Sequence, residues 1–266
     1  MTDCLVVIPC YNEEARLDRR AFLRFDDEAP PEIRLLFVDD GSTDSTAELL
    51  EQMVAASPTR LELLRLPGNR GKAEAVRLGM LEVLRRGPTF AGYWDADLAT
   101  PLHLIPLFRE RLVHEPSIDL LLGSRVNLLG RRVRRAPLRH YSGRFFATVA
   151  SLVLQLPVYD TQCGAKMLRV NERTSTLFEK PFFTRWIFDV EIVGRLLQLY
   201  RSRGDEEFRR LYEYPVTLWT DVAGSHIQLL DVWTGTLELL RLYRAELRHL
   251  PPRPPDPAPE EWPFPR

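Results

Sequence analysis

Two aspartates separated by one residue stand in the stretch YWDADLATP, residues 93–101. Asp95 and Asp97 directly follow an apolar run at 90–94 that is typical of the end of a buried strand. Two like charges this close together are costly to bury unless a cation or hydrogen-bond donors lie between them. In an extended segment residues i and i+2 point the same way, so the carboxylates should converge while Ala96 faces away. Paired hard oxygens of this kind suit Mg²⁺ or Mn²⁺.

A second interpretation makes Asp95 and Asp97 N-cap residues ahead of an expected helix over 101–114. Asp39 and Asp40 raise the same question at the end of the apolar run in VDDGSTDST, where Asp, Ser and Thr are also ordinary turn residues. Two acids at the very end of a strand cost more free energy than a turn requires. We therefore expect at least one of Asp39 and Asp40 to contact a ligand.

Short β-rich runs alternate with helical patterns in the first half of the chain. The expected strands cover 4–8, 33–39, 61–66, 90–94 and 118–123, and the expected helices cover 13–25, 45–56, 72–86 and 101–114. This alternation of nearly continuous apolar strands with helices predicts βαβ units and a mostly parallel sheet covered on both faces. Ligands of such sheets gather at the carboxyl ends of the strands, where PCYNEE, DDGSTD, DADLAT and GSR all fall. The sequence therefore predicts a doubly wound α/β fold with its polar chemistry on one edge.

The pattern changes after Arg125. A basic, loop-like stretch leads into an apolar helix near 145–158, and DTQCGAKMLR precedes helical runs near 185–201 and 227–250. The apolar run is shorter than the roughly 20 residues that a membrane-spanning helix needs, and MTDCLVVIP lacks the basic region of a signal peptide. The proline-rich residues 251–266 are expected to form a disordered or extended tail.

Composition excludes several classes of function. The 266 residues carry 36 Lys plus Arg against 37 Asp plus Glu, and a net charge of -1 gives no overall attraction to nucleic acid. Three cysteines without a CxxC pair predict neither a disulfide framework nor a zinc site, and they favour a reduced, cytoplasmic setting. No G-x-G-x-x-G follows the first strand, and GNRGKAEA does not have the spacing of a phosphate-binding P-loop. Hydride transfer and ATP hydrolysis are therefore disfavoured.

Four motifs, VVIPCYNEE, VDDGSTDST, NRGKAEAV and DADLATP, occur in the order and about the spacing found in family 2 glycosyltransferases, which the chain resembles. The resemblance implies a GT-A fold, a three-layer αβα sandwich with a mostly parallel central sheet. It implies that Asp95 and Asp97 bind a divalent metal, Mg²⁺ or Mn²⁺, on the diphosphate of a nucleotide-sugar, with Asp95 also contacting the donor. The residues that it places around the nucleotide-sugar are Pro9, Tyr11, Glu13, Asp39, Asp40 and Lys72.

The second half of the chain resembles a smaller group of enzymes within this family. DTQCGAKMLR (160–169) and RWIFDVEIVGR (185–195) are similar to segments of dolichyl-phosphate β-glucosyltransferases and, more loosely, of dolichyl-phosphate mannose synthases. Those enzymes transfer a sugar from a nucleotide donor to the phosphate of a polyprenol, with inversion at the anomeric carbon. Mannose synthases tend to have glutamine where this chain has Ala99, which favours UDP-glucose over GDP-mannose. We expect one domain over 1–250, with a nucleotide-sugar and metal half (1–125) and an acceptor half with interfacial helices (126–250).

Seven arginines and no acid lie between Arg125 and Tyr159. The arginine fork suits bidentate binding of phosphate, and a basic stretch beside an apolar helix suits a lipid phosphate at a membrane surface. The predicted acceptor-phosphate contacts are Arg125, Arg139 and Arg144, whereas the arginines within 131–135 would steer toward anionic lipid. The protein would then lie on the cytoplasmic face of the membrane. A solvated basic loop before a core helix explains the same residues.

Whether the reaction needs a catalytic base depends on whether the acceptor group is a phosphate or a hydroxyl. A phosphomonoester is already anionic near neutral pH, whereas a sugar hydroxyl must lose a proton. Asp189 and Glu191 are the candidate bases, although Asp189 could instead pair with Arg185 four residues earlier on a helix.

Three further residues have less defined roles. Gln162 and Asp160 could reach the metal, the donor sugar or the acceptor, and His226 lies either near the active site or on a surface loop. Two rival functions remain, a glycosyltransferase acting on a hydroxyl of a soluble acceptor and a catalytically weak nucleotide-sugar binding protein. The intact metal and nucleotide motifs argue against the second rival.

Overall fold

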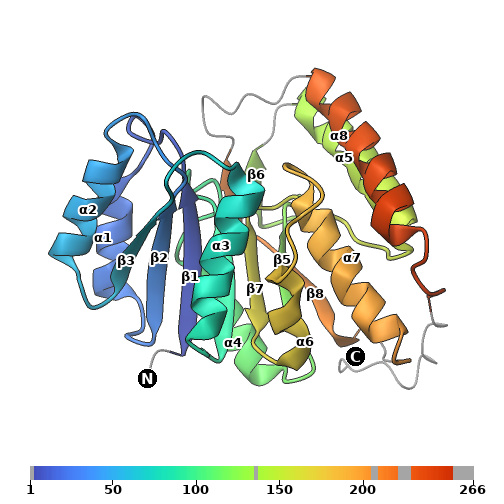
Figure 1. The fold of residues 1–266 in the computed structure, drawn as a ribbon, viewed down its shortest axis with the longest axis horizontal. Coiled ribbons are helices and arrows are strands. Elements are labelled where there is room, and N and C mark those ends of the chain that lie inside the picture. Colours follow the sequence, from blue (N-terminus) through green and yellow to red (C-terminus); the bar gives the residue numbers. More distant parts are fainter. Residues whose placement is uncertain (1–2, 135–136, 205–208, 221–228, 254–266) are drawn as a thin grey trace.

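The computed structural model describes residues 3–134, 137–204, 209–220 and 229–253. Within these residues, seven strands form one sheet in the order β3-β2-β1-β4-β7-β5-β8, and two short strands pair as β6-β9 (Figure 1). The strands are β1 (Cys4–Cys10), β2 (Ile33–Asp39), β3 (Leu61–Arg65), β4 (Phe90–Trp94), β5 (Leu120–Ser124), β6 (Arg132–Arg134), β7 (Ala165–Arg169), β8 (Leu211–Pro215) and β9 (Leu218–Thr220).

The helices occupy the segments between the strands and the carboxyl-terminal part of the described chain. They are α1 (Arg19–Glu28), α2 (Thr46–Ala56), α3 (Lys72–Arg85), α4 (Leu104–His114), α5 (Pro137–Leu154), α6 (Glu172–Ser175), α7 (Phe188–Arg201) and α8 (Leu229–Leu242). A short 3-10 helix covers Thr176–Phe178, and a π-helical turn covers Tyr243–Leu247.

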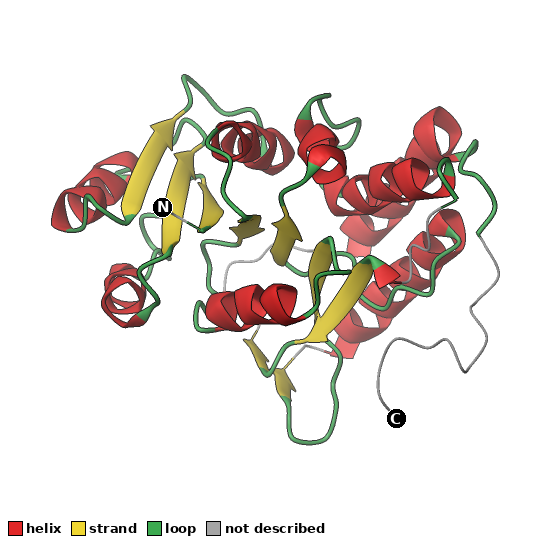
Figure 2. Ribbon diagram, turned by 90° about the horizontal axis from the view of Figure 1, so that it is seen from below, coloured by secondary structure: helices red, strands yellow, loops and turns green. Residues whose placement is uncertain are grey.

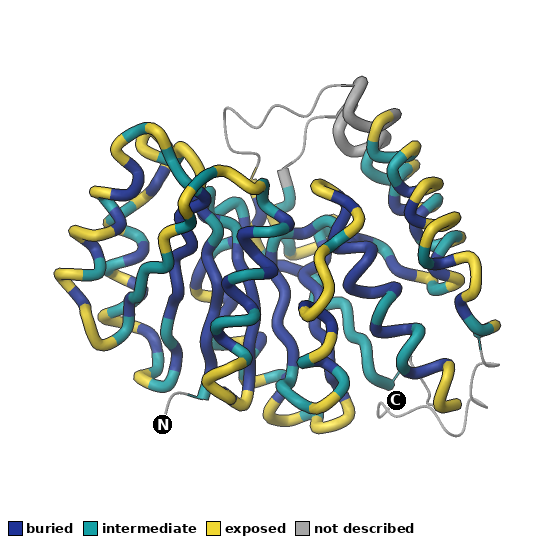
Figure 3. Tube along the Cα trace, viewed as in Figure 1, coloured by how far each residue is buried: buried dark blue, intermediate teal, exposed yellow. Residues whose placement is uncertain are grey.

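Apolar side chains alternate between the two faces of the sheet and form one cluster on each face. One cluster joins alternate residues of β1 and β2 to α3, α5, α7 and α8, and the other joins the intervening residues to α1, α2 and α4. Figure 2 shows helices on both sides of the sheet, and Figure 3 shows buried positions running along its strands. The predicted three-layer, mostly parallel α/β architecture of the GT-A type is therefore confirmed.

One strand of the main sheet runs against the others. β7 pairs antiparallel with both β4 and β5, whereas the other described pairs of this sheet are parallel. The register pairs Trp94 with Ala165, so the chain enters β7 beside the point where β4 ends. This reversal brings the segment before β7, DTQCG, next to the DAD segment after β4.

Several helix boundaries differ from the predictions. α1 begins at Arg19 and not near residue 13, because Glu13 accepts backbone hydrogen bonds from Arg16 and Leu17 in a separate turn and Asp18 caps the helix. α4 begins at Leu104 after His103, so neither Asp95 nor Asp97 caps it. The capping interpretation of the aspartate pair is therefore wrong for this helix.

The helices α5 and α8 pack together beside the sheet (Figure 1). On α5, Ala150 and Leu154 are buried, whereas Phe145 and Leu152 are 52% and 72% exposed. α5 therefore has a core face and an exposed face that still carries apolar side chains. Among the described residues, no helix combines the length and apolarity needed to cross a bilayer.

Replacing Gly92 by alanine should destabilise the centre of the sheet. A Cβ at this position in β4 would lie 2.4 Å from the carbonyl oxygen of Lys166 on β7, and a backbone atom cannot move aside alone. We expect the free energy of unfolding to fall by about 1–3 kcal/mol, measured by denaturant unfolding. Gly68→Ala is the control, because a Cβ there meets nothing within 4 Å. Equal stability of both variants would contradict this close β4–β7 packing.

Candidate active site

The loops after β1 and β2 are joined by side-chain hydrogen bonds. Asn12 donates its backbone N–H to the Ser42 hydroxyl at 3.0 Å, and its side-chain oxygen accepts from the Thr43 backbone at 2.9 Å. The backbone N–H of Glu13 donates to the Thr46 hydroxyl at 2.7 Å. The motifs PCYNEE and DDGSTD therefore form one rigid surface at the carboxyl edge of the sheet.

Asp40 fastens a third loop to this surface. Its two carboxylate oxygens accept the backbone N–H groups of Arg70 and Gly71 at 2.8 and 2.7 Å, and the side chain is buried. Gly41 has φ of +66°, and a Cβ on it would lie 2.4 Å from the Cα of Gly68. Asp40 thus positions the NRGK segment, which differs from the ligand contact predicted for it.

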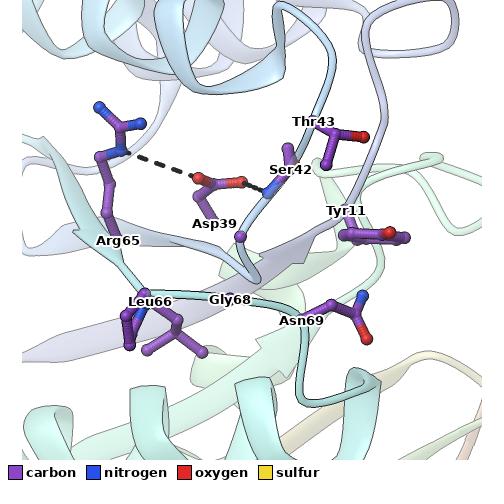
Figure 4. A pocket seen from close by; sticks show the side chains of 10 residues that line it. Tyr11, Asp39, Ser42, Thr43, Arg65, Leu66, Gly68 and Asn69 are labelled. Atoms are coloured by element: carbon purple, nitrogen blue, oxygen red, sulfur yellow. Dashed lines mark hydrogen bonds and ion pairs between the residues drawn. The ribbon is translucent and has the colours of Figure 1, made fainter.

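Asp39 instead lines a hollow of about 720 Å³. Its Oδ1 accepts the Ser42 backbone N–H at 3.1 Å, and its Oδ2 lies 3.8 Å from Nε of Arg65. Figure 4 shows Asp39 between Arg65 at one end and Tyr11 at the other. The remaining lining comes from Gly41, Ser42, Thr43, Leu66, Pro67, Gly68 and Asn69. Two predicted pocket residues, Asp39 and Tyr11, therefore meet here, whereas Pro9, Glu13 and Lys72 lie outside this lining.

Asp95 and Asp97 lie in a turn and not in the extended segment that was predicted, and they are close enough for the charge of Asp95 to raise the pKa of Asp97. β4 ends at Trp94, and Asp97 accepts the backbone N–H of Ala99 at 3.0 Å. The Asp95 carboxylate packs over Gly164, where a Cβ would lie 1.9 Å from its Oδ2, and its backbone N–H donates to the Gly164 carbonyl at 2.8 Å. Gly164 is therefore required at this position because any side chain would displace Asp95.

Three carboxylates influence one another in this region. Burial and the neighbouring Asp95 carboxylate raise the pKa of Asp97 above its ordinary value. Burial raises the pKa of Glu13, with Asp97 and Asp95 adding to the effect, although Arg16 opposes it through an ion pair at 2.7 Å. Among the described residues, Asp97 has no ion-pair partner within 4 Å. The site therefore concentrates negative charge that its own cations only partly balance.

Lys72 supplies the nearest positive charge. It is the first residue of α3, and its Nζ lies 2.6 Å from Oδ1 of Asp95. Burial alone would lower the pKa of Lys72, but Asp95 and Asp189 outweigh it and raise that pKa. The lysine is therefore a charged ammonium that faces the aspartates.

The paired aspartates fit a divalent metal in a limited way. Asp95 and Asp97 offer the hard carboxylate oxygens that Mg²⁺ and Mn²⁺ prefer. One oxygen of the nearby Glu13 is buried with no hydrogen-bond partner among the described residues. That part of the chain has no group of three or more His, Cys, Asp or Glu side chains placed to hold an ion by itself. Substrate oxygens and water would have to complete the coordination.

Asp189 is buried and does not pair with Arg185. Its Oδ1 accepts from the Tyr93 hydroxyl and from the ammonium of Lys166, a fully buried lysine that also donates to the Cys163 carbonyl at 2.7 Å. Glu191, the other candidate base, is also buried and accepts the backbone N–H groups of Phe183 and Thr184. Both acids are thus held by internal partners.

The arginines that were predicted to contact the acceptor phosphate differ in their partners. Arg125 was predicted to contact phosphate, but its Nε and Nη2 form a bidentate pair with the buried Asp160 at 2.6 and 2.8 Å. Arg144 donates to the Tyr159 carbonyl at 3.2 Å and lies 3.8 Å from the centre of its ring. Arg125 therefore acts as a brace, while Arg144 lies beside the DTQCG loop.

The DTQCG loop also carries an unpaired amide. The Gln162 backbone N–H donates to Asp160 at 3.1 Å, while its side-chain Nε2 is buried without a partner among the described residues. The side chains of Arg134 and Arg139, and residues Arg135 and His226, lie outside the described part of the chain.

Sequence reasoning missed Gly164, Lys166 and Tyr93. A signal was present for Lys166, because a lysine inside the apolar strand AKMLR must find a buried acid. For Gly164 the signal was its place in CGAK directly before a strand. Tyr93 gave none, because an aromatic residue in an apolar strand is ordinarily a packing residue.

Comparison with known proteins identifies the family of this chain. Residues 5–171 match the model of glycosyl transferase family 2. The chain belongs to that family. It is a glycosyltransferase, as the resemblance predicted.

Two curated relatives of this glycosyltransferase are dolichyl-phosphate beta-glucosyltransferases. That of Trichomonas vaginalis is 30% identical over 247 residues, covering 89% of this chain and 69% of the relative. That of Dictyostelium discoideum is 28% identical over 260 residues, covering 92% and 74%. A crystal structure of glucosyl-3-phosphoglycerate synthase from Mycobacterium tuberculosis, in complex with Mn²⁺ and UDP-glucose, shares the fold with a TM-score of 0.59. It is 19% identical and covers 92% of this chain and 79% of its own.

Replacing Asp97 by Asn should stabilise the glycosyltransferase at neutral pH. Because the pKa of Asp97 is raised, the folded protein holds this proton more tightly than the unfolded chain. The stability from this group is therefore present at low pH and is lost as the pH rises through the raised pKa. We expect Tm to rise by about 1–3 °C at pH 7, and the difference to vanish below about pH 4. Scanning calorimetry across this pH range measures both.

Glu82→Gln is the control of opposite sign. Hydrogen bonds from Arg85 and Arg86 lower the pKa of Glu82, so its charge stabilises the fold at neutral pH. This variant should have a lower Tm than the parent at pH 7. A lower Tm for Asp97→Asn as well would show that the Asp97 charge is not a source of instability.

Proposed function

We propose that this glycosyltransferase moves glucose from UDP-glucose to a polyprenyl phosphate, with a divalent metal and with inversion at the anomeric carbon. The observation that carries the proposal is the placement of Asp95 and Asp97 at the same sheet edge as the hollow lined by Tyr11 and Asp39. Asp95 and Asp97 supply hard oxygens for a metal, and the hollow supplies an aromatic face and a carboxylate for a nucleoside. Residues 1–250 would act as one domain, since a single apolar cluster contains Leu5 and Leu250.

The donor would lie across the motif loops. Tyr11 is 41% exposed and can stack on a base, while Asp39 can accept a hydrogen bond from a ribose hydroxyl. Asp97 and Asp95 would hold Mg²⁺ or Mn²⁺, which stabilises the charge that develops on the departing diphosphate. A neighbour of the same fold holds Mn²⁺ and UDP-glucose, and the relatives are named glucosyltransferases, so we favour UDP-glucose over GDP-mannose.

The contacts of the two candidate bases favour a phosphate acceptor. Asp189 shares its Oδ1 between Tyr93 and Lys166, and Glu191 binds backbone N–H groups and Arg195. Glu191 and the Oδ1 of Asp189 are thus engaged by internal partners, which disfavours either acid as the base, and we assign Asp189 a positioning role. A phosphate oxygen needs no such base. The names of the two relatives, both dolichyl-phosphate enzymes, support the same acceptor class.

The surface around the acceptor half suits a lipid phosphate. Arg144 lies beside the DTQCG loop, and Arg185 is exposed next to the Gly71 turn, 3.4 Å from where a Cβ on that glycine would be. Apolar side chains stay exposed on α5 and on the 183–186 loop, where Phe183 is 52% and Trp186 72% exposed. Arginines beside exposed apolar groups fit a peripheral contact with the membrane surface.

The decisive assay compares acceptors that differ in one group. Short polyprenyl phosphates, the matching free polyprenols and simple sugars are each incubated with UDP-glucose or GDP-mannose and with Mn²⁺ or EDTA. We expect transfer from UDP-glucose to the phosphates, dependent on metal, with an inverted anomeric centre in the NMR spectrum of the product. Transfer only to hydroxyls would overturn the phosphate acceptor, and donor binding without transfer would indicate a binding protein.

Two variants test whether transfer depends on the proposed metal site. Asp97→Asn should lose at least about 100-fold in rate, because a metal that stabilises the leaving group contributes several kcal/mol. Asp27→Asn removes an exposed acid on α1 that does not line the hollow, and it should keep the parent rate. Loss of rate in both variants would point to a general effect of charge.

A further inference from the structure

The contact between Lys72 and Asp95 suggests a role for the lysine beyond holding the nucleotide. The two side chains are 35% and 26% exposed, and 2.6 Å separates Nζ from Oδ1. Lys72 also feels the charges of Asp189 and Asp97. The lysine therefore lies against Asp95 and within range of the charges of Asp97 and Asp189.

The Asp95 carboxylate has little freedom to serve two cations. It packs against Gly164, where a Cβ on that glycine would lie 1.9 Å from Oδ2, and the Asp95 backbone N–H donates to the Gly164 carbonyl at 2.8 Å. Oδ1 is the oxygen that Lys72 contacts. A divalent ion bonded at this carboxylate would lie close to the ammonium, and two positive charges at that separation repel each other strongly.

The ammonium group of Lys72 can move away from Asp95. Four methylene groups separate Nζ from the backbone, so the ammonium can move while α3 stays in place. Asp189 is already paired with the buried Lys166, so it offers only weak competition for a second ammonium. A diphosphate beside the metal would offer several anionic oxygens within reach of the first residue of α3.

We propose that Lys72 is a displaceable counter-cation of Asp95, which leaves this carboxylate when a divalent metal binds and moves to the diphosphate of the donor. This inference rests on the proposed function. Without a nucleotide the metal has to displace Lys72 with no compensation, so it binds weakly. With a nucleotide the displaced ammonium gains a new partner, so metal and donor favour each other's binding.

The binding test uses two lysine variants. Lys72→Met removes the competing charge and keeps the length of the side chain. Lys180→Met is the matched control, because Lys180 is exposed and forms no ion pair with a described carboxylate. Mn²⁺ binding without nucleotide, followed by electron paramagnetic resonance of the free ion, should be roughly two- to fivefold tighter in Lys72→Met, as expected for a partly exposed ion pair. Lys180→Met should match the parent.

Addition of UDP should separate the two variants further. In the parent and in Lys180→Met, UDP should tighten Mn²⁺ binding more than it does in Lys72→Met, where no lysine is left to move. Unchanged or weaker Mn²⁺ binding by Lys72→Met without nucleotide would overturn the inference, because Lys72 would then support the metal site. The transfer assay with the parent enzyme is a separate result, so failure of the proposed function would be recognised independently.

A measurement on the parent protein makes the test independent of any variant. The chain has three lysines, Lys72, Lys166 and Lys180, so their side-chain signals can be resolved after ¹⁵N or ¹³C labelling of lysine. Titration with diamagnetic Mg²⁺ should shift the Lys72 signal and leave that of Lys180 in place. A Lys72 signal that does not move while Mg²⁺ binds would contradict the displacement.

Discussion

Negative charge at the carboxyl edge of the sheet is the constraint on which the rest of this site depends. Glu13, Asp95 and Asp97 come from two loops, and burial together with mutual repulsion raises the pKa of Glu13 and of Asp97. Arg16 and Lys72 neutralise part of that charge. Among the described residues, Asp97 accepts one hydrogen bond, within its own turn, and its partly buried charge lowers the stability of the fold. Such a costly arrangement with little structural return is typical of a functional site. A divalent cation would relieve this repulsion, which supports the metal site that we propose for Asp95 and Asp97.

The surrounding structure keeps these acids in place. Asp40 binds two backbone N–H groups of the NRGK loop, and Gly41 lets that loop approach closely. On the other side, the reversal of β7 places Gly164 against Asp95 and buries Lys166 beneath it, where the lysine pairs with Asp189. The acidic cluster is thus braced from both halves of the chain. Substrate-binding loops that are held in this way need little reorganisation when ligand arrives, which favours catalysis by electrostatic stabilisation.

Much of the fold followed from the sequence because its signals are local. Apolar strands alternating with helices predicted the parallel sheet, and β1, β2, β3 and β4 lie within about three residues of their expected ends. The reversed strand β7 was not foreseen, because strand direction depends on distant pairing and leaves no periodic signal. The same limit applies to the site. The spacing of Asp95 and Asp97 singled them out as a pair, whereas the pairing of Arg125 with Asp160 could only emerge from tertiary structure.

The central claim is that Asp97 and Asp95 bind a metal that the nucleotide donor shares. Isothermal titration of UDP into the protein with and without Mn²⁺, for the parent and for Asp97→Asn, tests it most directly. We expect Mn²⁺ to tighten UDP binding by about tenfold or more in the parent, a typical coupling between linked ligands, and to have no such effect in the variant. Equal UDP affinity of the parent with and without Mn²⁺ would contradict the account.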